Sequence, residues 1–210
     1  MPDDAPRWRR RKAARPAEIL AAALDVFAQK GFAAAKLDEI ARRAGVSKAA
    51  LYLYYETKED LFRAAARSLA APGLEAVAAA VEALDAPFAQ AAPLVLARAA
   101  AFLAEGRPAQ LATMVVGEAR NFPDLARIWE EDVVGRVLGM VTTMIARAQA
   151  RGEVRPGDPQ LYAFTLMGPL VMGALFNAVF GAVTEKRCDL VRLAEQHARV
   201  VVAGLRPPAS

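Results

Sequence analysis

The sequence predicts an all-α protein, and three observations support that fold class. Hydrophobic residues make up 55% of the 210 residues and aromatic residues only 7%; much of the apolar content is alanine, which favours helices. Apolar residues recur three and four positions apart, and no segment alternates β-branched and polar residues as a half-buried strand would. Proline and glycine divide the chain into about ten pieces of helical length.

The expected helices follow in order, and most begin or end at a recognisable residue. Pro16 suits the first turn of a helix, and Gly31 follows the end of that piece. Pro72 and Gly73 are expected to end the fourth helix. The expected helices cover residues 16–30, 37–44, 47–54, 57–71, 74–85, 88–105, 108–121, 124–151, 159–182 and 187–204.

Residues 37–55 predict two short helices joined by a tight turn. Ile40 lies on the apolar face of the first helix and is expected to pack against Phe27. Gly45 suits the left-handed conformation that ends a helix, and Ser47 suits the N-cap of the next one. Two helices connected by so short a turn form a helix-turn-helix.

The second of these helices presents a face that needs a partner. At about 100° per residue, Leu51 turns toward the small core, whereas Lys48, Tyr52 and Leu53 lie on the other side. Exposed Tyr and Leu side chains do not stabilise the fold, so they indicate a binding surface. Duplex DNA fits, because a helix enters the major groove, Lys and Tyr reach phosphates, and Leu contacts thymine methyl groups. Packing of Tyr52 and Leu53 against another helix is the alternative.

Basic residues gather in the first third of the chain. The first 70 residues carry 14 Lys and Arg against 9 Asp and Glu, whereas the other 140 carry 13 against 14. This difference indicates a surface that binds a polyanion. A basic run that includes Arg9, Arg10 and Arg11 either is a solvated tail or follows the DNA backbone or minor groove. Farther on, Thr57 predicts an N-cap, and Lys58 at the same helix start predicts a phosphate clamp.

A family resemblance rests on residues 15–62, which read RPAEILAAALDVFAQKGFAAAKLDEIARRAGVSKAALYLYYETKEDLF. In order and spacing this stretch closely resembles the DNA-binding domain of TetR-type transcriptional regulators. The resemblance implies a homodimer that binds a palindromic operator on double-stranded DNA, most often as a repressor. A cytoplasmic location is expected from the single cysteine and from a charged N-terminal stretch unlike a secretory signal. It also implies a C-terminal half that responds to a small lipophilic effector. No cofactor and no membrane are expected as partners.

The resemblance also implies which side chains contact DNA. Ala35 and Lys36 stand where family members often have Thr followed by Ser or Thr, so a weaker helix cap is expected. The frequent Gly-Thr of the recognition helix is Ala49-Ala50, and the frequent His is Leu53, so shape readout contributes more to recognition. The expected DNA contacts are Lys36, Arg43, Ser47, Lys48, Ala49, Ala50, Tyr52, Leu53 and Lys58, with Arg9, Arg10 and Arg11 from the arm.

The expected organisation is a basic arm at residues 1–15, a helix-turn-helix three-helix domain at 16–56, and a helical ligand-binding and dimerisation bundle at 57–210. Met and Phe residues spread over several helices of the bundle suit either a packed core or an adaptable pocket. The expected ligand-binding residues are Phe88, Phe102, Gln110, Thr113, Met114, Glu118, Asn121, Trp129, Met144 and Met167.

The last two helices are expected to form the dimer interface. Their glycine and alanine residues permit close approach, and two helices from each subunit would make a four-helix bundle. The expected interface residues are Leu166, Leu170, Gly173, Ala174, Asn177, Leu193, His197 and Val200. Residues 161–183 carry no charge over a length that could cross a membrane, so a membrane-associated helical regulator is the alternative.

Other function classes fit the residues less well. His197 is the only histidine and Cys188 the only cysteine. No nucleophile–base–acid set, phosphate-binding glycine loop or metal-ligand cluster is present at a usable spacing. We therefore do not expect an enzyme or a metal site. A helical interaction module that does not bind DNA would leave the face around Lys48 and Tyr52 unexplained.

Overall fold

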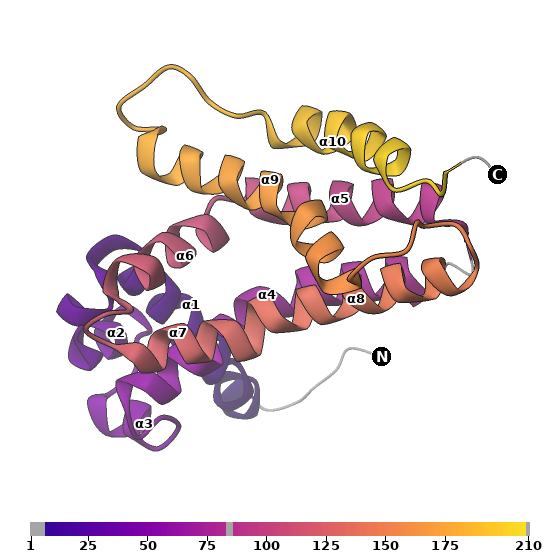
Figure 1. The fold of residues 1–210 in the computed structure, drawn as a ribbon. Helices are drawn as coiled ribbons and strands as arrows, with labels where there is room; N and C mark the ends of the chain where they lie inside the picture. The colour runs from indigo at the N-terminus through magenta and orange to yellow at the C-terminus, as the bar shows by residue number, and fades with distance from the viewer. Residues whose placement is uncertain (1–6, 83–85, 209–210) are drawn as a thin grey trace.

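The computed structural model confirms the all-α fold (Figure 1). It describes residues 7–82 and 86–208, and within them the side chains of residues 7–15, 77 and 80–82 are not described. Every regular element in these two ranges is helical. The elements are α1 Arg7–Ala34, α2 Leu37–Arg43, α3 Lys48–Tyr52, α4 Lys58–Glu82, α5 Phe88–Ala104, α6 Arg107–Glu118, α7 Pro123–Trp129, the π-helical turn η1 Glu130–Val134, α8 Gly135–Ala150, α9 Pro159–Phe180 and α10 Leu190–Gly204.

The first helix begins earlier than the sequence predicts. The backbone of α1 is already helical at Arg7, so Pro16 lies inside the helix and not at its first turn. The expected separate arm is thus a helical extension over residues 7–15, while residues 1–6 lie outside the described part. Gly31 interrupts the helix at φ 78°, and a Cβ there would collide with Oε1 of Glu118. The left-handed φ therefore favours glycine at this position, and a larger residue would also displace the Glu118 carboxylate.

The expected break at Pro72-Gly73 is wrong, because α4 continues through both residues. A proline inside a helix removes one backbone hydrogen bond and costs about 3 kcal/mol. Tertiary packing offsets this cost: Ala70 and Leu74 are buried on either side, and α4 crosses α5 closely. A Cβ at Gly73 would lie only 2.9 Å from Cδ2 of Phe102, so the small residue permits this crossing.

The expected long helix over 124–151 is confirmed as the continuous run α7, η1 and α8. Its middle turn, η1, is π-helical and places Asp132 and Val133 toward α4. Single π-helical turns inside α-helices occur frequently at functional sites. This turn is the place where the helical run departs from regular geometry, and it faces both the cavity and the ion pairs described below.

Three hydrophobic clusters are joined by shared helices: two large ones, called here the first and second cores, and a small one of Ala66, Ala70, Leu74 and Val133. The first surrounds the rings of Phe27, Phe32 and Phe62, and it also takes Leu111 from α6 and Ile128 from α7. The second lies among α5, α8, α9 and α10 and consists mainly of alanine, leucine and valine. Figure 1 shows α1, α2 and α3 gathered at one end of the molecule, with α4 and α8 running away from them and α9, α5 and α10 stacked above.

Candidate nucleic-acid interface and ligand cavity

The turn between α2 and α3 has the geometry that the sequence predicts. Gly45 adopts φ 66°, and the N–H of Val46 donates to the carbonyl of Ala41 at 3.0 Å, which satisfies the end of α2. Ser47 Oγ accepts a hydrogen bond from the N–H of Ala50 at 3.1 Å and so caps α3. Leu51 is fully buried and holds α3 against the first core.

The outer face of α3 is open to solvent. Lys48 and Ala49 are exposed, Tyr52 retains 42% of its surface, and Leu53, just past the last residue of α3, retains 85%. The alternative in which Tyr52 and Leu53 pack against another helix is therefore wrong for this chain. An aromatic ring, a long aliphatic side chain and a cation lie next to one another without covering any core. This arrangement suits the edges and phosphates of a DNA groove.

Lys48 is paired with an acid of the preceding helix. Its Nζ lies 2.8 Å from Oδ1 of Asp38 and 6.0 Å from the centroid of the Tyr52 ring. The hydrogen bond to Asp38 and the charge of that carboxylate raise the pKa of Lys48. Asp38 thereby holds the ammonium group over the exposed face, and a phosphate or base that binds Lys48 has to compete with this carboxylate.

Lys58 lies differently from the expected phosphate clamp. Its Nζ donates to the carbonyl of Phe32 at 2.7 Å, to that of Ala33 at 3.3 Å and to that of Ala35 at 3.2 Å. It also lies 4.4 Å from the centroid of the Phe32 ring. Three donors of one ammonium group are therefore already used inside the protein. We correct the expectation accordingly: Lys58 closes the loop between α1 and α2.

The remaining expected DNA contacts surround the face of α3. Lys36 and Arg43 are exposed, and Arg43 pairs with Glu39 at 3.3 Å. Lys36 makes no side-chain cap for α2, as predicted. Thr57 does cap α4, since its Oγ1 accepts from the N–H of Asp60 at 3.0 Å. The side chains of Arg9, Arg10 and Arg11 lie outside the described part of the chain.

A cavity of about 150 Å³ lies between the second core and the small cluster that includes Ala70, Leu74 and Val133. Its walls come from α4, α5, α6, the run from α7 to α8, and α9. Three of the expected ligand-binding residues line it, namely Phe102, Trp129 and Met167. Nearly all other lining side chains are apolar, and the one charged residue is Arg98 of α5. Sequence reasoning missed Arg98, although a single cation within the apolar helix 88–105 is a visible signal.

The other seven expected ligand-binding residues lie elsewhere. Phe88 and Met144 are buried in the second core, and Met114 packs against the first. Gln110 and Asn121 are exposed to solvent. These five residues do not line the cavity, because apolar spacing alone does not determine which face of a helix borders a cavity.

Thr113 and Glu118 do not line the cavity either, and their polar groups bind other parts of the chain. Thr113 Oγ1 donates to the carbonyl of Ala109 in its own helix at 2.8 Å. The two carboxylate oxygens of Glu118 accept from the N–H groups of Phe32 at 2.8 Å and Ala33 at 2.7 Å. Glu118 therefore connects the end of α6 to the end of α1.

Comparison with known proteins identifies this arrangement. The family model described as "Bacterial regulatory proteins, tetR family" matches residues 19–65, and that described as "Tetracyclin repressor-like, C-terminal domain" matches residues 93–191. The chain belongs to the TetR family of transcriptional regulators. It is accordingly a DNA-binding regulator of transcription, and its relatives are regulators of the same kind.

The similarity to other transcriptional regulators extends over nearly the whole length of this chain. The transcriptional regulator RutR of Escherichia coli K12 is 26% identical over 212 residues, which cover 92% of each chain. A TetR-family regulator from Mesorhizobium loti has a crystal structure with a TM-score of 0.77 at 26% identity, covering 92% of this chain and 98% of that one. FadR of Bacillus subtilis in complex with stearoyl-CoA gives a TM-score of 0.73 at 19% identity, over 90% and 99%, and shows the same fold.

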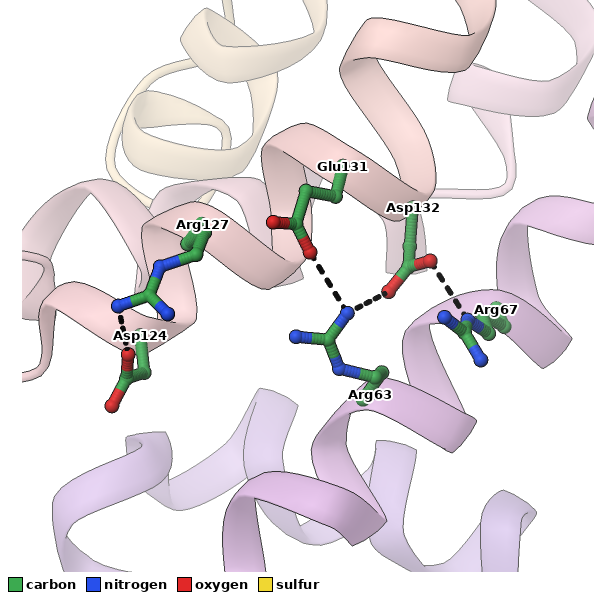
Figure 2. Close-up of polar contacts among 6 residues, drawn as sticks. All are labelled: Arg63, Arg67, Asp124, Arg127, Glu131 and Asp132. Atoms are coloured by element: carbon green, nitrogen blue, oxygen red, sulfur yellow. Dashed lines mark hydrogen bonds and ion pairs between the residues drawn. The ribbon is translucent and has the colours of Figure 1, made fainter.

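In this TetR-family chain, α4 and η1 are joined by an ion-pair cluster beside the cavity. Figure 2 shows Asp132 between two arginines of α4: Arg63 donates to it at 3.1 Å and Arg67 at 2.7 Å. Arg63 also donates to Glu131 at 2.9 Å, and this hydrogen bond is the main reason why the pKa of Arg63 is raised. Asp132 is the one buried charged residue in the described part of the chain. The cluster ties the π-helical turn to α4.

The expected dimer helices are present, but most of the expected residues point inward. Leu166, Leu170, Gly173 and Ala174 are buried within the chain. Leu193 packs against the second core. Of the eight residues, only Val200 is exposed.

The two polar residues of that set bind groups of their own chain. Asn177 accepts from the N–H of Cys188 and donates to its carbonyl, each at 2.8 Å. Nε2 of His197 lies 3.2 Å from the carbonyl of Thr165 and 3.1 Å from that of Leu166. The expectation is corrected for the four residues buried within one chain, whereas a dimer role for Asn177, Leu193, His197 and Val200 stays a prediction.

The outer side of α9 is apolar and exposed. We call these residues the α9 stripe; they are Leu161, Phe164, Val171, Met172, Phe176, Val179 and Phe180. Val191 and Val200 of α10 are exposed as well. Taken alone, α9 is long and apolar enough to cross a membrane, and 33% of its most apolar window is buried. Such a stripe needs a covering surface, because monomeric proteins rarely expose large apolar patches.

Proposed function

We propose that this protein is a dimeric repressor whose α3 face binds a palindromic operator and whose release from DNA is triggered by a small lipophilic effector in the cavity. The observation that carries the proposal is the exposed face of Lys48, Tyr52 and Leu53, held outward by the buried Leu51. Repression is the role most common for this family and requires only that a bound dimer block access to the DNA.

The proposed DNA surface extends from α3 along α2. Lys48, Ala49, Ala50, Tyr52 and Leu53 enter the major groove, where Leu53 meets thymine methyl groups. Ser47, Lys36 and Arg43 contact phosphates on either side, and Arg9, Arg10 and Arg11 are proposed to contact the DNA backbone or minor groove. Lys58 is left out of the contacts because its ammonium group is bound inside the protein. Few hydrogen-bonding groups face the bases, so the shape of the operator contributes to recognition.

The α9 stripe supports a homodimer. Burying it against the same stripe of a second copy gives a self-complementary interface of the kind that twofold dimers use. The alternative of a membrane-associated regulator fits a family of DNA-binding proteins less well. We expect Met172→Glu to convert the dimer into a monomer in analytical ultracentrifugation, because it places a charge in the centre of the stripe. The same change at exposed Val116 of α6 serves as the control.

The ion-pair cluster supports a route from effector to DNA. Val133 of η1 and Leu74 of α4 both line the cavity, and Asp132 joins the same two elements. A ligand that separates η1 from α4 therefore shifts α4, which begins at the helix-turn-helix. The ligand weakens operator binding if it binds this shifted arrangement better than the DNA-bound one.

A DNA titration tests the proposal. The protein is titrated near physiological salt against the DNA upstream of its own gene and against a scrambled duplex, alongside the Lys48→Ala, Tyr52→Ala double variant. We expect tight binding to the upstream fragment only, weakened about tenfold to a hundredfold in the double variant. Lys186→Ala, an exposed lysine in the loop after α9, is the control variant. Equal binding to both duplexes with a steep salt dependence would contradict specific recognition by α3.

A further inference from the structure

The chemistry of the cavity limits what can bind there. Ala99, Phe102, Trp129, Val137 and Met167 give it apolar walls. Burial of an apolar ligand surface is the main contribution that such walls make to binding. No acidic side chain lines the cavity among the described residues. A ligand with several polar groups would lose its hydration without gaining partners.

Arg98 is the exception in this lining. It lies on α5 at the solvent edge of the cavity, since its side chain is exposed while Ala99 beside it is buried. Within the described ranges, Arg98 makes no hydrogen bond or ion pair. Arg63 and Arg67 of α4, by contrast, are both paired with Asp132. An unpaired guanidinium group at the edge of an apolar cavity favours an anion there and disfavours a cation.

The size of the cavity sets a second limit. A volume of about 150 Å³ is comparable to apolar protein cavities that hold a benzene ring. This space accepts a ring or a short branched chain, whereas a long acyl chain would not fit without movement of the surrounding helices. The ligand is therefore compact.

We infer that the effector is a compact aromatic or branched monoanion, whose apolar body lies between Phe102, Trp129 and Met167 and whose carboxylate pairs with Arg98. A planar carboxylate matches the fork of donors on a guanidinium group. The cavity walls then determine the size of the ligand, and Arg98 determines its charge and its orientation. This inference rests on the proposed function in taking the cavity as the effector site.

Calorimetric titration of the protein without DNA tests the inference. The probes are 4-methylbenzoate, its neutral analogue 4-methylbenzamide and the cation 4-methylbenzylamine, measured on the wild type and on Arg98→Gln. We expect the wild type to bind the acid about fivefold more tightly than the amide, and the amine most weakly. The expected preference is only modest because the pair between the carboxylate and Arg98 lies at the solvent edge. Arg98→Gln is expected to bind the acid and the amide equally. Arg147→Gln, an exposed arginine of α8 outside the cavity, should keep the preference.

Three outcomes would overturn the inference. One is equal binding of acid and amide by the wild type, and another is a preference for the acid that survives in Arg98→Gln. The third is that none of these probes binds at millimolar concentration, even if stearoyl-CoA, a long-chain ligand measured alongside, does bind. Since no DNA is present, each outcome is independent of the operator titration. A failure of the proposed function would appear in that titration and a failure of the inference in the calorimetry.

Discussion

The DNA-binding end and the cavity end of the molecule are packed with side chains of different kinds. Around α1 and the start of α4, the rings of Phe27, Phe32 and Phe62 lie 5.5–5.9 Å apart and are fully buried. Around the cavity, alanine, valine and leucine make up most of the lining, and Phe102 is only partly buried. The aromatic core keeps the recognition surface in one shape, whereas the cavity end retains space that a ligand can fill.

Helices α6 and α4 each belong to both ends. On α6, Pro108 and Ala112 line the cavity, while Glu118 binds the backbone at the end of α1. At the start of α6, Arg107 pairs with Asp25 of α1 at 2.8 Å. On α4, the first turns belong to the aromatic core and the middle borders the cavity. A shift of either helix at the cavity therefore reaches the DNA-binding end.

The largest expected effect compares one substitution in the two regions. Phe27→Ala should lower the free energy of unfolding by about 3–5 kcal/mol, because it leaves a hole in a fully packed core. Phe102→Ala should lower it by about 1–2 kcal/mol, since this ring already borders empty space. Urea unfolding followed by circular dichroism measures both. Equal losses would contradict the difference between the two ends.

A smaller effect is expected in the cluster that links the regions. Asp132→Asn keeps the shape but removes the charge that Arg63 and Arg67 share, so we expect a loss of about 2 kcal/mol in stability. Asp124→Asn removes an exposed pair with Arg127, also drawn in Figure 2, and should change stability by less than about 0.5 kcal/mol. Urea unfolding of both variants measures this difference in stability. If the Asp132→Asn variant were as stable as the wild type, the cluster would not hold η1 against α4.

The smallest expected effect distinguishes a structural lysine from one that binds DNA. Lys58→Met removes three hydrogen bonds to backbone carbonyls and should cost about 1–2 kcal/mol of stability. Lys36→Met should leave stability within about 0.5 kcal/mol of the wild type and weaken only DNA binding. Thermal unfolding and operator titration are measured on both variants. If Lys58→Met kept full stability and lost operator affinity, the phosphate role first expected for Lys58 would be restored.

Local signals were sufficient to predict the helix-turn-helix. Gly45 and Ser47 fix a turn by their own conformations and caps, and Leu51 fixes which side of α3 is buried. These are interactions between residues close in the sequence. The continuation of α4 through Pro72 could not be predicted, because the packing that favours it comes from Phe102, which is distant in the sequence.

The faces of α9 and the direction of Lys58 show the same limit. Apolar residues occur on all sides of α9, so its sequence gives no indication of which side faces its own chain and which faces outward. Lys58 bends toward carbonyls of the loop after α1 only because the fold brings that loop beside the start of α4. For similar reasons the expected cavity residues included Phe102 and Trp129 and omitted Arg98.

The most direct test of the account asks whether the cavity controls DNA binding. Ala112→Leu on α6 fills part of the cavity without any ligand, and Ala146→Leu adds the same side chain to an exposed position of α8. Operator affinity is measured for both variants and the wild type, after unfolding curves establish that all three are folded. We predict that Ala112→Leu binds the operator at least about tenfold more weakly than the wild type, while Ala146→Leu binds like the wild type. Unchanged affinity in a stably folded Ala112→Leu variant would contradict the account.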